Sequence, residues 1–180
     1  IHVAKSLKIK ANKRSGKSKM QYDNFFPARD YKKYKSLALR NGGNGYSYVQ
    51  PRWRDMFIQS LGDRMNLDRQ MAQPVAFYLN GIFYGMMILT ERTNEDYVYH
   101  NYGLDEDEID FLGVGYSCEA GTKEAYNVMI DYVSKSYTND DFYDRLATMM
   151  DIDEYIDYQI LEQYVGNTDW VSNNIKLWRK

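Results

Sequence analysis

The spacing of apolar residues predicts short, half-buried strands at the start of the chain. Leu7 and Ile9 alternate with polar residues in SLKIKA, and Leu37 and Leu39 repeat this spacing in YKSLALR. Successive strand side chains point to opposite faces, so this period of two is typical of a strand with one buried face. The first strand leads into the polar, turn-forming stretch NKRSGKSK, and the second into the glycine-rich NGGNG at 41–45. No helix start directly follows NGGNG, which favours a plain turn over a phosphate cradle.

The period becomes helical from Arg52. Trp53, Phe57 and Leu61 recur every four residues and predict an amphipathic helix that ends near Gly62 or Asn66.

A β-hairpin follows in QPVAFYLNGIFYGMMIL, residues 73–89. Apolar residues alternate up to Asn80-Gly81, and this pair tolerates the positive φ angles that a two-residue hairpin turn requires. The return strand, 82–89, is almost continuously apolar. We therefore expect it to be buried on both faces.

The second half of the sequence is acidic at first and helical afterwards. Residues 91–118 are acidic and interrupted by glycines, and Asp105–Glu108 is typical of a helix start, where negative charge is favoured. Three helices are then predicted, over 125–133, 142–149 and 152–164, the last with a capping box at Asp151 and Glu154. Strands with one helix followed by a helical region predict an α+β fold.

Composition excludes some classes of protein. No apolar run approaches the roughly 18 residues of a membrane span, so no transmembrane segment is predicted. The first residues, IHVAKSLKIK, lack the apolar core of a signal peptide and an initiating Met, so we expect an excised fragment or a processed chain. The single cysteine and two histidines are too few for a disulfide framework or a zinc site.

Charge is distributed unevenly. Residues 1–40 contain 12 of the 23 basic residues and only two of the 25 acidic ones. A solvated Lys-rich strand pair is the commonest meaning of such a pattern. An anionic ligand held between two lobes, and nucleic-acid binding that weakens steeply with salt, are the alternatives.

The candidate for chemistry is GNTDWVSNNIKLW, residues 166–178. It lies after the third predicted helix and runs into IKLW, 175–178, which is predicted to be a short strand. A helix, a polar loop with Asp169 five positions before Asn174, and a strand form the arrangement of a protein-kinase catalytic loop. In that loop the Asp orients the substrate hydroxyl and the Asn binds a metal ion. A solvated loop is the alternative, because this spacing alone occurs often by chance.

Several blocks together resemble the spore-coat protein H (CotH) kinase family of atypical, secretory-type protein kinases. They are KSLKIK at 5–10, LRNGGN at 39–44, RDMFIQSL at 54–61, FYLNGIFYGMMILTER at 77–92 and GNTDWVSNNIKLW. The resemblance implies a two-lobed, kinase-like domain over 1–180. Its N lobe, 1–91, would hold antiparallel strands and one helix, and its C lobe, 92–180, would be mainly helical. ATP and Mg²⁺ or Mn²⁺ would bind between the lobes.

The resemblance also implies roles for individual residues. Lys5 would contact the nucleotide phosphates, and Glu91 would lie in the hinge region near the adenine. Asp169 would be the catalytic-loop aspartate and Asn174 a metal ligand, with Asn173 as a close rival. The substrate would be a protein Ser or Thr hydroxyl, no nucleic acid is expected as a partner, and the location would be extracellular, at the cell surface or in a spore coat.

The sequence departs from the family pattern in three ways. The Gly/Ser/Arg-rich stretch expected just before Lys5 is absent, so residues are expected to be missing near Val3-Ala4. A further metal-binding Asp is expected beyond Lys180, and the helix at 52–61 offers only Asp55 as an acidic partner for Lys5. A non-catalytic, kinase-like surface or coat module that binds protein partners is therefore the alternative function.

Overall fold

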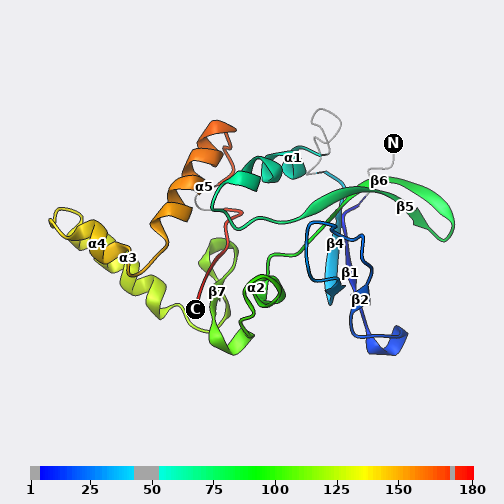
Figure 1. Ribbon diagram of the computed structural model, residues 1–180, viewed down its shortest axis with the longest axis horizontal. Helices are drawn as coiled ribbons and strands as arrows, with labels where there is room; N and C mark the ends of the chain where they lie inside the picture. The colour runs from blue at the N-terminus through cyan, green and yellow to red at the C-terminus, as the bar shows by residue number, and fades with distance from the viewer. Residues whose placement is uncertain (1–4, 43–52, 171–172) are drawn as a thin grey trace. The chain divides into compact units, whose positions relative to one another are not determined.

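A computed structural model of the chain describes residues 5–42, 53–170 and 173–180 (Figure 1). It contains two compact units, which we describe separately. Unit 1 comprises residues 1–63 and 68–100, and unit 2 comprises 64–67 and 101–180. Antiparallel sheets together with separate helices confirm the predicted α+β class. The predicted lobe boundary at 91/92 stays a prediction; the compact part of unit 1 extends to His100.

Unit 1 is built on a four-stranded antiparallel sheet. Its strands lie in the order β1 (Leu7–Lys10), β4 (Ser36–Arg40), β6 (Ile82–Thr90) and β5 (Ala72–Leu79). A small ribbon of β2 (Met20–Gln21) and β3 (Lys33–Tyr34) accompanies this sheet, and a short 3₁₀ turn, η1 (Lys13–Ser15), precedes β2. The predicted strands around Leu7 and Leu37 are thus confirmed. Of the NGGNG turn, residues 43–45 lie outside the described part of the chain.

The core of unit 1 lies on one face of this sheet. Leu37 and Leu39 of β4 are buried, as their alternation predicts, and Leu39 pairs in register with Leu89 of β6. Met87 and Leu89 lie on the same face, and Phe26 and Tyr34 pack against them. The residues between β2 and β3 therefore cover the sheet and complete the core.

The β5–β6 hairpin is confirmed, but its predicted burial is wrong for the first half of β6. Leu79 pairs with Ile82, so Asn80 and Gly81 form the two-residue turn, with φ angles of 51° and 80°. Ile82 is 74% exposed, and Phe83 and Met86 are also exposed. Among the described residues, β6 pairs with β4 from Ile88 to Thr90, and the core cluster includes Met87 and Leu89 but no residue of 82–86. The rest of the hairpin forms a two-stranded arm, drawn in green in Figure 1.

Two helices complete unit 1. The predicted amphipathic helix is α1 (Arg54–Leu61), which leads into the 3₁₀ turn η2 (Gly62–Arg64). Its apolar residues Trp53 and Phe57 are about half exposed, at 52% and 51%. The helix α2 (Glu95–Tyr102) was not predicted from the acidic stretch. It forms because Tyr97 and Val98 are buried, a tertiary contribution that eight residues of weak periodicity do not reveal.

Unit 2 contains a three-stranded antiparallel sheet in the order β8 (Cys118–Ala120), β7 (Asp110–Leu112) and β9 (Leu177–Arg179). Phe111 and Leu112 of β7 are buried. The 3₁₀ turns η3 (Glu106–Glu108) and η4 (Val114–Tyr116) flank β7. Asp105 caps η3 in a capping box with Glu108, which confirms the predicted acidic helix start.

The helices of unit 2 are α3 (Glu124–Ser136), α4 (Phe142–Leu146) and α5 (Ile152–Tyr164). The cap of α5 is confirmed in part, since the Asp151 side chain accepts a hydrogen bond from the Glu154 N–H. The predicted extent of the second helix to 149 is wrong, because α4 ends at Leu146 and the chain continues in turns. There the Thr148 hydroxyl donates to the Arg145 carbonyl, a local bond that competes with helix continuation.

Candidate functional site

The loop that contains Asp169 begins where α5 ends. Gly166 follows α5 with a φ of 61°, a left-handed conformation that glycine adopts readily and that commonly terminates helices. The Asn167 N–H then donates to the Glu162 carbonyl, 3.0 Å away, which satisfies one of the last free carbonyls of the helix. The Gly-Asn pair that the sequence analysis treated as a helix break therefore ends α5 in a defined geometry.

Two asparagine amides hold the Asp169 carboxylate. Asn173 Nδ2 donates to Oδ1 at 2.8 Å, and Asn174 Nδ2 donates to Oδ2 at 2.8 Å. Asn174 Nδ2 also lies 3.3 Å from the Asp169 carbonyl oxygen. The structure thus brings Asp169 together with both asparagines that the sequence put forward. The strand behind them, β9, begins at Leu177 instead of the predicted Ile175.

The backbone of Asn174 explains part of this arrangement. Its φ is 59°, in the left-handed region that asparagine tolerates better than most residues. This conformation turns the chain back so that the Asn174 amide reaches both the side chain and the carbonyl of Asp169. Asp169 itself is exposed. Its carboxylate is therefore accessible and is oriented by hydrogen bonds instead of by packing.

The donor chemistry of this loop fits a magnesium ion. Mg²⁺ prefers oxygen ligands and is often bound through one or two carboxylates together with substrate phosphates. Because both asparagines donate through nitrogen, their amide oxygens point away from those bonds, and Asp169 supplies a carboxylate. Among the described residues no group of three or more His, Cys, Asp or Glu side chains could hold a metal. A cation at this loop would thus depend on phosphate oxygens for much of its coordination.

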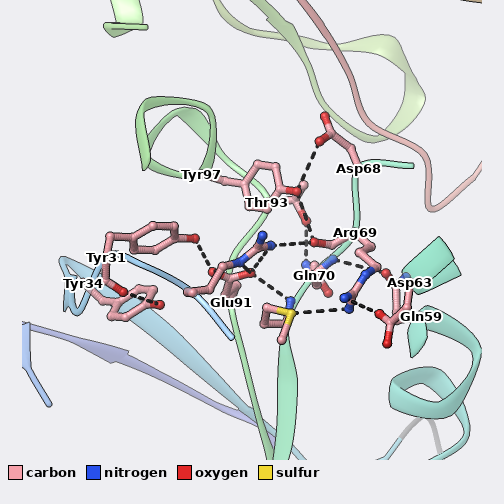
Figure 2. Close-up of polar contacts among 12 residues, drawn as sticks. Tyr31, Tyr34, Gln59, Asp63, Asp68, Arg69, Gln70, Glu91, Thr93 and Tyr97 are labelled. Carbon is pink, nitrogen blue, oxygen red and sulfur yellow. Dashed lines mark hydrogen bonds and ion pairs between the residues drawn. The ribbon is translucent and has the colours of Figure 1, made fainter. Parts of the chain in front are cut away.

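Glu91, predicted near the adenine, lies at the end of β6 and is buried in unit 1 (Figure 2). Its carboxylate accepts hydrogen bonds from Arg29, from the Tyr31 hydroxyl and from the Met71 N–H, the last at 2.8 Å. Arg29 Nη2 also donates to the Arg69 carbonyl at 2.9 Å. Glu91 therefore joins the segment before β3 and the segment before β5 to the end of β6.

Burial and the charge of Glu91 change the pKa values of Arg29, Tyr31 and Tyr97, which surround it. Burial by itself would lower the pKa of Arg29, but the hydrogen bonds and charge of Glu91 outweigh it and raise that pKa. The pKa of Tyr31 is raised by burial first and by its hydrogen bond to Glu91 second. Burial also raises the pKa of Tyr97, whose hydroxyl donates to the Arg69 carbonyl. The cluster is thus a charged pair surrounded by neutral tyrosines.

Lys5, predicted to contact phosphates, is exposed just before β1, and its N–H lies 3.4 Å from the Tyr84 hydroxyl oxygen. The structure does not bring it to Glu91. Leu7 of β1 and Leu89 of β6 both pair with Leu39 of β4. Lys5 lies two residues from this level toward one end of the sheet, and Glu91 lies two residues from it toward the other end. Lys5 and Glu91 are therefore separated along the strand direction by four residues, or about 13 Å.

Asp55 of α1, the acidic residue that the sequence offered as a partner for Lys5, instead forms an ion pair with Arg40 at 3.1 Å. Both side chains are about half exposed, at 46% for Arg40 and 50% for Asp55. The structure thus gives Asp55 a partner on β4 and does not connect it to Lys5.

Four residues in or near the Asp169 loop were missed by the sequence analysis. Asn167 Oδ1 accepts the Asp169 N–H at 3.0 Å, and Asn167 Nδ2 donates to Glu162 at 2.5 Å. Tyr158 of α5 contacts Trp170 edge to face, with 5.6 Å between ring centroids. The spacing of Asn167 and Asp169 is that of an Asx turn, a local signal that could have identified the first contact. The roles of Glu162 and Tyr158 depend on the path of the loop and carry no such signal.

These observations define an α+β protein in which a helix-to-strand loop presents an exposed aspartate held by two asparagines. The chain belongs to the CotH kinase family, because the family model described as CotH kinase protein matches residues 2–180. No curated protein and no solved structure gives a significant match to the chain. Within the described ranges, no helix is long and apolar enough to cross a membrane.

Proposed function

We propose that this chain is a kinase domain that transfers the γ-phosphoryl group of ATP to a Ser or Thr hydroxyl of a protein. Membership of the CotH kinase family supports this proposal. The observation that carries it is the Asp169 carboxylate, exposed at the end of α5 and fixed by the amides of Asn173 and Asn174. A carboxylate of this kind is suited to accept a hydrogen bond from an incoming hydroxyl.

In the proposed reaction Asp169 orients the substrate hydroxyl and accepts its proton as the oxygen attacks the γ-phosphorus, while the bond to the β–γ bridging oxygen breaks and ADP leaves. Asn174 would hold Mg²⁺ through its amide oxygen, and the bound ion would neutralise charge on the phosphates. Lys5 would contact those phosphates as a compact cation. Glu91 would lie in the hinge near the adenine. We further propose the two-lobed arrangement, with 1–91 as N lobe, 92–180 as C lobe and ATP between them.

The partners of the proposed kinase would be proteins outside the cell, at the cell surface or in a spore coat. A non-catalytic module that binds protein partners is the second candidate. The observation that favours it is the hairpin arm, on which Tyr78, Ile82 and Phe83 are exposed at 59%, 74% and 54%. Exposed aromatic and aliphatic side chains gathered on one element are typical of interaction surfaces.

Transfer of labelled phosphate from ATP to a mixture of Ser- and Thr-containing proteins tests the proposal. The wild type is compared with Asp169→Asn, Asp169→Ala and the control Asp153→Asn, which removes one exposed carboxylate from the start of α5. We expect the control to match the wild type and both Asp169 variants to lose at least about 100-fold in rate, a typical effect of losing a general base. Equal incorporation by all four proteins would eliminate the catalytic role of Asp169.

Thermal melting with Mg-ATP separates the two candidate functions. A kinase domain that binds nucleotide is stabilised by it, and the stabilisation grows with the logarithm of the ligand concentration over the dissociation constant. The melting temperature should therefore rise with millimolar Mg-ATP. No rise, together with no phosphate transfer, would favour the non-catalytic module.

A further inference from the structure

Asp169 is flanked on both sides by contacts that lead back to α5. On its N-terminal side, its N–H donates to Asn167 Oδ1 at 3.0 Å, and Asn167 Nδ2 donates to the Glu162 carboxylate at 2.5 Å. On its C-terminal side, the ring of Trp170 meets the ring of Tyr158 at an interplanar angle of 78°. We call Tyr158, Glu162, Asn167 and Trp170 the α5 clamp. Asp169 lies between its two ends.

The two α5 residues of the clamp lie on the same side of the helix. Tyr158 and Glu162 are four residues apart, the spacing at which helical side chains are neighbours. Burial, then the charge of Glu162 and hydrogen bonding to it, raise the pKa of Tyr158 to about 12. The Glu162 carboxylate thus accepts a hydrogen bond from Asn167 in one half of the clamp and contributes to the raised pKa of Tyr158 in the other.

Among the described residues, the Asp169 backbone has two hydrogen-bonding contacts: its N–H donates to Asn167 Oδ1, and its carbonyl oxygen lies 3.3 Å from Asn174 Nδ2. Asp169 is exposed, and Gly166, three residues earlier, has a left-handed conformation in which rotation is easy. Asn173 and Asn174 hold the carboxylate, but they belong to the same loop and move with it. The clamp connects Asp169 to a regular element, the 13-residue helix α5.

We propose that Glu162 is a positioning residue that sets the direction of the Asp169 carboxylate through Asn167, with Tyr158 and Trp170 as the second support. This inference rests on the proposed function, in which Asp169 accepts the substrate proton. A catalytic group displaced by about 1 Å can lose about 100-fold in rate, so the clamp should affect turnover much more than nucleotide binding.

The kinetic test compares Glu162→Ala, Glu162→Gln and Asn167→Ala with the wild type and with the control Asp153→Asn on the same helix. We expect kcat to fall by about ten- to 100-fold in Glu162→Ala and Asn167→Ala, with KM for ATP unchanged within about twofold. Glu162→Gln keeps an acceptor for Asn167, so it should recover a large part of kcat. A kcat within twofold of the wild type for both alanine variants would overturn the proposal, and so would equal losses in kcat and in ATP affinity.

A second measurement does not depend on activity. In ¹⁵N-labelled protein, the amide of Asp169 should exchange with solvent faster in Asn167→Ala and in Glu162→Ala, and more slowly in Glu162→Gln than in Glu162→Ala. An Asp169 amide that exchanges as in the wild type in all three variants would contradict the clamp. If the wild type transfers no phosphate, the proposed function fails, and these exchange rates still decide whether Glu162 fixes the loop.

Discussion

Arg29 and Glu91 form a bidentate ion pair, in which Arg29 Nη2 lies 2.8 Å from Glu91 Oε2 and Nε lies 3.2 Å from each carboxylate oxygen. The Glu91 side chain is only 2% exposed, and that of Arg29 19%. A carboxylate at this depth loses its hydration, and the surrounding hydrogen-bond donors offset that loss. Glu91 therefore has a structural role in unit 1.

We expect Arg29→Ala to destabilise the protein strongly. It leaves the Glu91 carboxylate buried without its cation, and breaking a buried pair in this way costs about 3–5 kcal/mol. Urea unfolding measures the loss, with Arg14→Ala as a control because Arg14 is exposed in η1. The control should change the free energy of unfolding by less than about 0.5 kcal/mol. A similar, small change in both variants would show that Glu91 is satisfied without Arg29.

His100 should make stability depend on pH. Its ring stacks on Tyr31 with 4.3 Å between centroids, and burial lowers its pKa from the ordinary 6.5. The folded protein thus favours the neutral ring. The contribution of His100 to the free energy of unfolding is complete above pH 6.5 and is lost as the pH falls from there through the lowered pKa.

Denaturant unfolding at several pH values between 7.5 and 5.5 tests the role of His100. The free energy of unfolding should decrease toward acid in the wild type and decrease less in His100→Phe, which keeps a stacked ring without a titrating group. Parallel curves for the two proteins would assign the pH dependence to other groups.

The hairpin turn should depend on Gly81. Its φ of 80° is unfavourable for any residue with a Cβ, although a Cβ built there would meet no atom within 4 Å. Gly81→Ala should therefore cost about 1–2 kcal/mol through backbone conformation alone. Because residues 82–87 pair with β5 alone within the described ranges, the effect should be local. Amide exchange should accelerate in residues 75–86 and stay unchanged in β1 and β4. Uniform acceleration would mean that the arm unfolds with the rest of the sheet.

Asn173 and Asn174 should differ in their effect on Mg²⁺. Asn174 reaches both the carboxylate and the carbonyl of Asp169, whereas Asn173 reaches one carboxylate oxygen. In melting experiments at fixed ATP, Asn174→Ala should raise the half-saturating Mg²⁺ concentration by about tenfold, equivalent to about 1.4 kcal/mol. Asn173→Ala should raise it by less than about threefold. A larger increase in Asn173→Ala than in Asn174→Ala would instead indicate Asn173 as the metal ligand.

The sequence correctly predicted those elements that are specified by residues close together in the chain. Alternation identified β4 through Leu37 and Leu39, Asn80-Gly81 located the hairpin turn, and Asp151 marked the start of α5. The spacing of Asp169 and Asn174 also identified two side chains that contact each other. Each of these depends on residues within a few positions of one another, where the geometry of one strand, turn or helix end fixes the result.

Only tertiary structure decided how far burial extends and which partners the polar residues take. The apolar composition of 82–86 predicted burial, but the core cluster of unit 1 contains none of these residues, and Ile82, Phe83 and Met86 are exposed. In the sequence, Glu91 is one acidic residue after a predicted strand. In the structure it forms an ion pair with Arg29, 62 positions away. The sequence thus determined the hairpin turn, the start of α5 and the aspartate loop, because those follow from local sterics and hydrogen bonding. Burial and ion pairing depend on segments that only folding brings together.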